Sequence, residues 1–314
     1  MKLNKIIDII CVGETLIDFI GHQQGVSINN TRDYHRYLGG SPTNVAMNLA
    51  RLGLEPALVA SVGNDGFGDY VLQRMREARV STQFIKCVDG IPTSTVFVSR
   101  STDTPDFIAY READFLITED QIPKEILSQV QIYHTTCFAL SKQPARNTIL
   151  NKAREASRLG CKLSIDLNYS EKIWKDREEA MAVIKEYCTL NPLVKISEDD
   201  MKRIFDTSVS KKQVFDFFHN NGVEVVCLTL GKNGVILSEK GKPTIQKSAI
   251  RIDQVKDTTG AGDAFWSGFL FAYIKKYPFD KCLAIALKLA ALKLQNVGRL
   301  PDNIDILANL LEHD

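Results

Sequence analysis

Apolar runs with the length of buried strands alternate along this chain with amphipathic segments that have the period of a helix. The segment 56–63 (PALVASVG) is apolar and ends at a glycine, whereas the apolar side chains at 45, 46, 49 and 52 of segment 43–53 share one helical face. Such alternation predicts a mostly parallel β-sheet with helices on both faces. The same patterns predict strands at 6–13, 131–137, 161–168 and 224–231, and helices at 68–80, 145–160 and over much of the chain from 262.

Two segments interrupt this alternation. Residues 14–38 and 91–112 contain alternating or β-rich stretches, such as TSTVFVSRS and DFIAYR, and show no helical period. They predict the strands of a small, separate sheet. Because both segments lie between elements of the main sheet, we expect the small sheet to project from it as a lid, with residues 1–314 forming a single domain.

The charge and the lack of long apolar runs argue against several classes of protein. A formal net charge of +1 disfavours a nucleic-acid-coating surface or a polybasic membrane patch. No run approaches the ~20 apolar residues that a membrane-spanning helix needs. The seven cysteines are odd in number and form no C-x-x-C pair, a pattern typical of reduced thiols. We therefore expect a soluble, cytoplasmic protein without nucleic-acid or membrane partners.

The stretch DTTGAGDAFWSG (257–268) places two glycines before an aspartate and an apolar helical run. At a helix start several backbone N–H groups lack partners, the helix dipole adds positive charge, and glycine lets an anion approach. This combination predicts a phosphate site. Asp263 beside it is suited to take a proton from an attacking hydroxyl. The alternative, from local chemistry alone, is that Asp263 satisfies the first helical turn.

Two long motifs resemble the signatures of the ribokinase-like (PfkB) carbohydrate kinases. DTTGAGDAFWSGF (257–269) is similar to the C-terminal signature, and GGSPTNVAMNLARLG (39–53), followed by VGNDGFGDY (62–70), is similar to the N-terminal one. The resemblance covers nearly the whole chain and implies a three-layer α/β/α domain with a mostly parallel central sheet and a small β-sheet lid. The subgroup that the chain resembles is the fructokinases, because GGSPTNVA is similar to their GGAPANVA pattern.

The resemblance implies transfer of the γ-phosphoryl group of ATP to a sugar hydroxyl, with fructose 6-phosphate as the product in a fructokinase. Asp263 would be the catalytic base, and the backbone of residues 260–263 would be the anion hole, built from Gly260, Ala261, Gly262 and Asp263. The sugar side would be formed by Asp18, Gly39, Gly40 and Asn44. The alternative roles are a surface strand residue for Asp18 and an ordinary turn for the two glycines.

Arg111, in the stretch IAYREAD, carries a guanidinium fork that suits a carboxylate or a phosphate. The family's YRxxSAD spacing is shortened to YREAD here, so we expect Arg111 to contact either the substrate or the phosphates. The alternative is a solvated charge near a turn. In the related 2-keto-3-deoxygluconate kinases, a tyrosine and an arginine here hold the acid group of the substrate. Because this chain has Tyr110 and Arg111, that activity is an alternative to fructokinase. A non-catalytic sugar-binding protein and a scaffold protein are alternatives from other classes.

The nucleotide side implied by the resemblance consists of Asn168, Thr229, Gly231, Gly234 and Asn296. Magnesium is expected, because the triphosphate charge must be neutralised. The family's N-x-x-E motif reads Ser197 to Asp200 here, which predicts Mg²⁺ held mainly through phosphates and water. Asp257 and Thr259 match positions that bind a monovalent cation such as K⁺ behind the anion hole. Lids of this family also mediate dimers, so a homodimer through the lid is expected.

Overall fold

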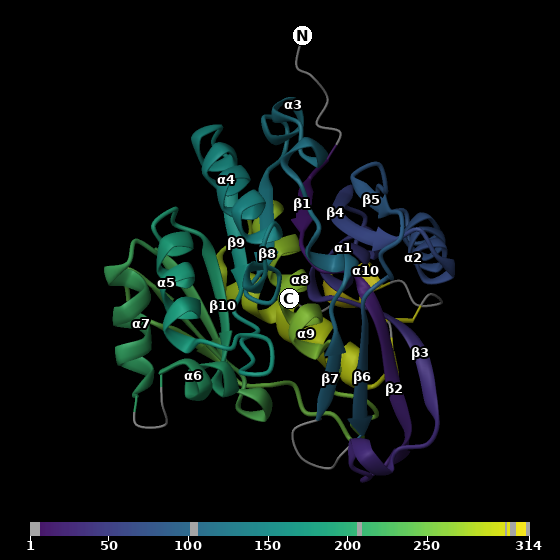
Figure 1. Cartoon of the computed structure of the whole chain (residues 1–314). Helices are drawn as coiled ribbons and strands as arrows, with labels where there is room; N and C mark the ends of the chain where they lie inside the picture. Colours follow the sequence, from purple (N-terminus) through teal and green to yellow (C-terminus); the bar gives the residue numbers. More distant parts are fainter. Residues whose placement is uncertain (1–6, 101–105, 206–208, 299, 302–305, 312–314) are drawn as a thin grey trace.

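Figure 1 shows the computed structural model, which describes residues 7–100, 106–205, 209–298, 300–301 and 306–311. Within these residues nine strands form one sheet, in the order β13-β12-β11-β10-β9-β8-β1-β4-β5. The strands from β11 to β5 pair in parallel, and β12 and β13 add antiparallel pairs at one edge. The strands are β1 (Ile9–Val12), β4 (Pro56–Gly63), β5 (Ile85–Val88), β8 (Ile132–Thr136), β9 (Lys162–Asp166), β10 (Leu193–Ser197), β11 (Val225–Thr229), β12 (Val235–Glu239) and β13 (Ile245–Lys247).

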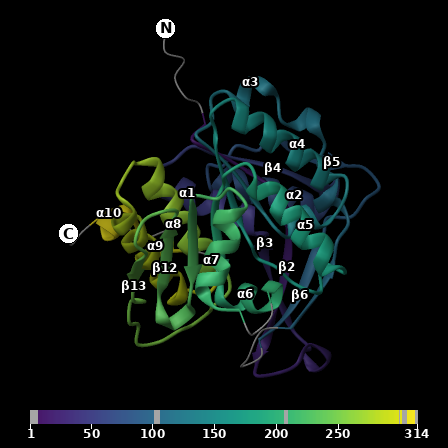
Figure 2. The same cartoon turned by 90° about the vertical axis from the view of Figure 1, so that its left-hand side faces the viewer.

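Helices cover both faces of this sheet, and each face has its own hydrophobic core. Helices α3 to α7 contribute to the core on one face, and α1, α2 and α8 to α10 contribute to the core on the other. In Figure 2, α8 to α10 lie on the opposite side of the molecule from α4 and α5. The predicted arrangement of helices on both faces of a mostly parallel sheet is confirmed. The helices are α1 (Ser41–Arg51), α2 (Gly66–Glu77), α3 (Lys124–Leu127), α4 (Ala145–Arg158), α5 (Arg177–Cys188), α6 (Glu198–Phe205), α7 (Lys211–Asn220), α8 (Ala261–Ile274), α9 (Phe279–Leu294) and α10 (Ile306–Leu311).

A second sheet projects from the main body, as predicted from the two segments that lack a helical period (Figure 1). In the described part of the chain it has four strands in the order β3-β2-β6-β7, in which β2 and β6 are parallel and the outer pairs antiparallel. We call this sheet the lid. Its strands are β2 (Leu16–Gln24), β3 (Tyr34–Gly39), β6 (Thr95–Arg100) and β7 (Phe107–Tyr110).

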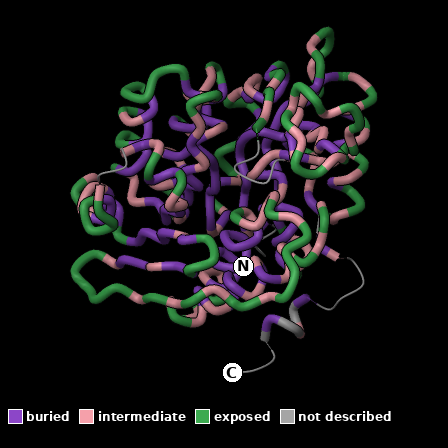
Figure 3. Tube along the Cα trace, turned by 90° about the horizontal axis from the view of Figure 1, so that it is seen from below, coloured by how far each residue is buried: buried purple, intermediate pink, exposed green. Residues whose placement is uncertain are grey.

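Burial follows the layers, with buried residues concentrated in the interior and exposed ones on the connecting segments (Figure 3). Strand β4 is buried along its whole length, which explains why its sequence is apolar throughout instead of alternating. None of the seven cysteines, all of which lie in the described residues, is part of a disulfide, and all except Cys87 are buried. Among the helices of the described residues, none combines the length and the apolar character that crossing a bilayer requires.

Candidate active site

The first turn of α8 is open at the surface of the main domain. Gly260 precedes the helix with φ 75°, a left-handed conformation that favours glycine, and Gly262 is exposed. Every residue from Ala264 to Ala272 is buried, which anchors the helix in the core. Among the described residues, no side chain caps the N-terminus of α8. The Ala261 amide donates to the Thr258 carbonyl at 3.2 Å, so among the described residues the amides of Gly262 and Asp263 are the ones in this turn available to an anion.

The carboxylate of Asp263 is held by two side chains from the first turn of α1. Ser41 Oγ donates a hydrogen bond to one carboxylate oxygen at 2.7 Å, and Asn44 Nδ2 donates to the other at 2.8 Å. Asp263 is half-buried and lies in the turn that carries the open amides. Asn44, which was predicted as a sugar contact, therefore also bonds Asp263, whereas Ser41 was not identified from the sequence.

Gly40 sets the point at which α1 begins. Its φ of 102° lies in the region that side-chain-bearing residues avoid, and a Cβ at this position would overlap the carbonyl oxygen of Glu14. The amide of Ser41 then donates to Glu14 Oε1 at 3.1 Å, and Thr136 Oγ1 donates to Glu14 Oε2 at 2.8 Å. Burial raises the pKa of Glu14 to about 8, although the hydrogen bond from Thr136 opposes this. Glu14 therefore positions the α1 turn, a role that the sequence did not reveal.

Asp18 extends from β2 of the lid towards the same turn. Its carboxylate lies directly against the backbone of Gly39, where a Cβ would overlap Oδ2. Burial, together with the neighbouring charge of Asp263, raises the pKa of Asp18 to about 7. The lid therefore brings a second carboxylate close to Asp263.

A buried ion pair lies beneath the other side of the α8 turn. Lys195 Nζ, from β10, is 2.8 Å from both carboxylate oxygens of Asp166, at the end of β9. A Cβ on Gly262 would lie 3.0 Å from that ammonium nitrogen. Burial alone would lower the pKa of Lys195, but the carboxylates of Asp166 and Asp200 outweigh it and raise the pKa. A fixed positive charge thus lies beside the first turn of α8, and no sequence motif singled it out.

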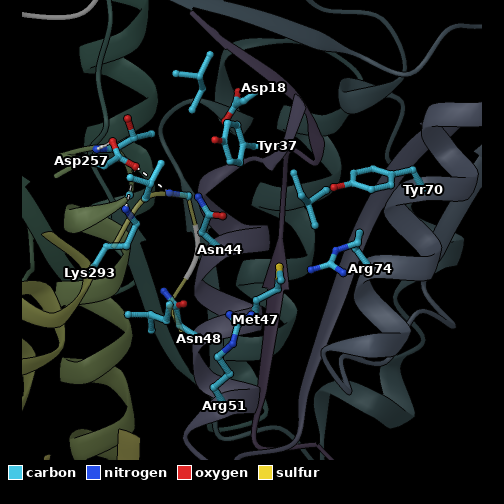
Figure 4. A pocket seen from close by; sticks show the side chains of 17 residues that line it. Asp18, Tyr37, Asn44, Met47, Asn48, Arg51, Tyr70, Arg74, Asp257 and Lys293 are labelled. Atoms are coloured by element: carbon cyan, nitrogen blue, oxygen red, sulfur yellow. Dashed lines mark hydrogen bonds and ion pairs between the residues drawn. The ribbon is translucent and has the colours of Figure 1, made fainter. Parts of the chain in front are cut away.

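A cavity of about 300 Å³ adjoins the Asp263 turn (Figure 4). Asp18 and Asn44 line it together with Gly260, so the structure brings these predicted residues to one space. In Figure 4, Asp257 and Lys293 lie on one side of the cavity, and Tyr70 and Arg74 lie on the other. Further lining residues that the sequence did not single out are Ile20, Tyr37, Leu38, Met47, Asn48, Arg51, Val297, Gly298 and Leu300.

Arg111 is buried in an internal ion pair. Its Nε and Nη2 donate to one oxygen of Asp114 at 2.9 and 2.6 Å, and its Nη1 donates to Ser141 Oγ. The guanidinium also lies 4.2 Å from the centre of the Phe138 ring. The side chain is only 4% exposed, so the alternative of a solvated charge is wrong. Contact with a substrate or phosphate stays a prediction.

Of the residues predicted for the nucleotide, four lie at or after the ends of strands of the main sheet, and Asn296 lies at the end of a helix. Asn168 follows β9, accepts a hydrogen bond from the Phe138 amide at 3.1 Å, and lines a second hollow. Thr229 ends β11, and the turn that follows contains Gly231 and Gly234. Asn296 lies just beyond α9, where its Nδ2 donates to the Leu292 carbonyl at 2.8 Å. These placements leave the nucleotide role a prediction.

Asp257 and Thr259, which the resemblance assigns to a monovalent cation, are joined by a hydrogen bond from the Thr259 amide to Asp257 Oδ1 at 2.9 Å. The other oxygen of Asp257 is already paired, because Lys293 Nζ lies 3.1 Å from it. In the residues that the structure describes, no group of three or more His, Cys, Asp or Glu side chains is arranged to hold a metal ion. Ser197 and Asp200 instead bond to each other at the start of α6.

The sequence of this chain matches the model of the pfkB family of carbohydrate kinases over residues 7–304. A relative named ATP-dependent 6-phosphofructokinase, from Thermoanaerobacterium thermosaccharolyticum, is 36% identical over 96% of this chain and 92% of its own length. The solved structure of fructokinase from Halothermothrix orenii is 34% identical, with a TM-score of 0.81 over 90% of this chain and 98% of that one. An uncharacterized sugar kinase from Pyrococcus horikoshii, solved in complex with ATP, is 27% identical, with a TM-score of 0.83 over 96% of this chain and 100% of that one.

Proposed function

The chain belongs to the pfkB family of carbohydrate kinases, phosphotransferases with a hydroxyl acceptor, and from that premise we propose that it transfers the γ-phosphoryl group of ATP to fructose. The observation that carries the proposal is the placement of Asp263. Its carboxylate lies in the first turn of an uncapped helix, beside a cavity that Asp18 and Asn44 line. Phosphoryl transfer to an alcohol requires a proton acceptor next to an anion site, and this arrangement supports the proposal that Asp263 and the α8 turn are that pair.

In the proposed reaction, Asp263 accepts the proton of the acceptor hydroxyl. Ser41 and Asn44 fix the orientation of its carboxylate beforehand, because each donates a hydrogen bond to it. The amides of Gly262 and Asp263 stabilise the charge of the transferring phosphoryl group, and they need no reorganisation because the helix core holds them. Mg²⁺ would supply charge neutralisation on the triphosphate, held through phosphates and water since the described residues offer no metal cluster.

The proposed sugar contacts come from both the lid and α1. Asp18 accepts hydrogen bonds from sugar hydroxyls, Asn44 both donates and accepts, and Gly39 and Gly40 let the backbone come close. Asn168, Thr229, Gly231, Gly234 and Asn296 are the residues proposed for ATP. Arg111, held by Asp114, is proposed to contribute positive charge near the substrates without leaving its ion pair.

A coupled assay of ADP release with a panel of acceptors tests the function. Fructose is expected to give the highest kcat/KM against 2-keto-3-deoxygluconate, ribose and adenosine. If adenosine or ribose is the best acceptor, the fructose assignment is wrong. If no acceptor supports ADP release above the rate with ATP alone, the kinase proposal itself fails.

Fructose 6-phosphate is the second candidate acceptor. One relative at 36% identity bears the name of a 6-phosphofructokinase. On the lid, His22 and His35 stack with ring centres 4.9 Å apart, and both line a small hollow with Arg100. The guanidinium of Arg100 would suit a phosphate at the far end of the sugar, and the two imidazole rings could donate hydrogen bonds to it; Asp257 lines the same hollow. A higher kcat/KM for fructose 6-phosphate than for fructose would decide in favour of this candidate.

The raised pKa of Asp18 predicts a pH dependence of sugar recognition. Because its pKa is raised to about 7, Asp18 is ionised above that pH and protonated below it. Protonation removes an acceptor for the sugar hydroxyls, so kcat/KM for the sugar should fall about tenfold per pH unit below 7. Profiles from pH 5.5 to 8.5 should show this fall in the wild type. Asp18→Asn should have a lower plateau without that step, and an unchanged step in the variant would contradict the assignment.

A homodimer through the lid is proposed from the face of the lid that carries Phe97. Phe97 contacts Phe19, Tyr34 and Tyr110 there, with ring centres 4.8 to 6.0 Å apart. Tyr110 is 56% exposed in the single chain, and the adjacent Ile108 is 45% exposed. Light scattering is expected to give twice the chain mass of 35.1 kDa. Tyr110→Glu should shift that value to the single-chain mass.

A further inference from the structure

The carboxylate of Asp257 connects two segments directly behind the anion hole. Oδ1 accepts the Thr259 amide at 2.9 Å, whereas Oδ2 accepts the Gly298 amide at 3.0 Å and lies 3.1 Å from Lys293 Nζ. Burial opposes the charge on Asp257, but these two amides and the ammonium group of Lys293 outweigh it and hold the pKa of Asp257 below its ordinary value. The residue is therefore a half-buried, charged carboxylate beside a site that must receive phosphate anions.

The ammonium group of Lys293 lies between the two segments that Asp257 connects. Its side chain is 4% exposed, and Nζ donates to the Asn296 carbonyl oxygen at 3.1 Å in addition to Asp257. Its Cε lies 3.6 Å from the position that a Cβ on Gly260 would take. The cation thus sits against the residue that begins the anion hole, and at the C-terminal turn of α9, where the helix dipole favours positive charge.

A carboxylate and a backbone carbonyl are ligands that a hard monovalent cation would use. Here Asp257 Oδ2 and the Asn296 carbonyl oxygen already accept hydrogen bonds from the ammonium group of Lys293. The residues present therefore do not fit a free cation between Asp257 and the α9 terminus. We propose that Lys293 is a built-in cation that replaces K⁺ behind the anion hole and makes turnover independent of added monovalent cations. This inference rests on the kinase function proposed above.

Two consequences follow from a cation that is covalently part of the chain. Lys293 neutralises Asp257, which would otherwise repel the phosphates of the nucleotide at close range. It also ties the turn before Gly260 to the end of α9, so the position of the anion-hole amides does not depend on salt composition. Lys293 is therefore a positioning residue, because it acts through Asp257 and Gly260.

Turnover of the wild type in KCl and in tetramethylammonium chloride, at equal ionic strength, is the first test. Wild-type kcat is expected to differ by less than about twofold between the two salts, because Lys293 supplies the charge. In Lys293→Thr, kcat should fall about tenfold or more in tetramethylammonium and recover in K⁺, which can enter the vacated space. Lys288→Thr is the matched control, since Lys288 lies on the same helix and also bonds a backbone carbonyl, that of Leu310. It should show no salt preference.

The melting temperature of Lys293→Thr in the same two salts gives a readout that does not need turnover. K⁺ should raise it relative to tetramethylammonium, whereas the wild type should melt equally in both. A several-fold activation of the wild type by K⁺ would overturn the inference, even if the variant does not fold. A folded variant that ignores K⁺ in both kcat and melting temperature would overturn it as well. If no acceptor is phosphorylated, the melting temperatures still test the cation site separately from the kinase function.

Discussion

Asp263→Ala is expected to lower kcat by about 10²- to 10⁴-fold, the range that general-base catalysis by a positioned side chain contributes. The reason is geometric, since Asp263 presents a carboxylate at the open turn of α8 while Ser41 and Asn44 fix its orientation. Sugar binding should survive, because Asp18 and Asn44 remain in the cavity. Steady-state turnover gives the loss in kcat, and calorimetric titration with the sugar gives the retained affinity.

A control separates the catalytic role of Asp263 from a role in the stability of the helix. Asp280 also lies in the first turn of a helix, α9, where its carboxylate pairs with Lys247 at 2.9 Å and is 67% exposed. Asp280→Ala should cost a similar, small amount of helix stability and leave kcat unchanged. If Asp263→Ala keeps near-normal turnover, Asp263 is a helix-terminus residue and the proposed mechanism is wrong.

The parts of the fold that the sequence predicted are those with a local signal. Strand β4 is apolar because it is covered on both faces, and α1 shows its buried face as a period of 3.6 residues. The lid was predicted in the same way, from stretches without a helical period. The antiparallel edge strands β12 and β13 were not predicted, since β13 has three residues and its neighbouring segments are largely exposed.

The residues of the candidate site also fall into two groups, those with a local signal in the sequence and those without one. The glycine-rich turn and Asp263 are contiguous in sequence, so helix-end chemistry was enough to predict an anion site there. Ser41 reaches Asp263 across 222 positions of the chain, and that contact exists only after α1 has packed against α8. Lys195 and Lys293 lie in apolar stretches where a lysine gives no sign of its partner. The fold topology decides which charged residues pair over long distances in the chain, so the local sequence pattern cannot predict these pairs.

Lys195→Met is expected to lower the free energy of unfolding by about 3–5 kcal/mol, the cost of leaving a buried charge without its partner. The ammonium group lies 2.8 Å from both oxygens of Asp166, whose side chain is only 1% exposed. Removing it leaves that carboxylate in the core without its cationic partner. Urea denaturation followed by circular dichroism measures the loss.

Asp166→Asn combined with Lys195→Met shows whether the pair serves stability, catalysis or both. The double variant removes both charges, so it should regain most of the stability that the single change loses. The kcat should be low in the single variant and in the double variant alike, because both lack the ammonium group beside Gly262, at the edge of the proposed anion hole. Recovery of kcat together with stability would show that Lys195 does no more than neutralise Asp166. Equal loss of stability in the single and double variants would show that the ion pair is not what holds this part of the core.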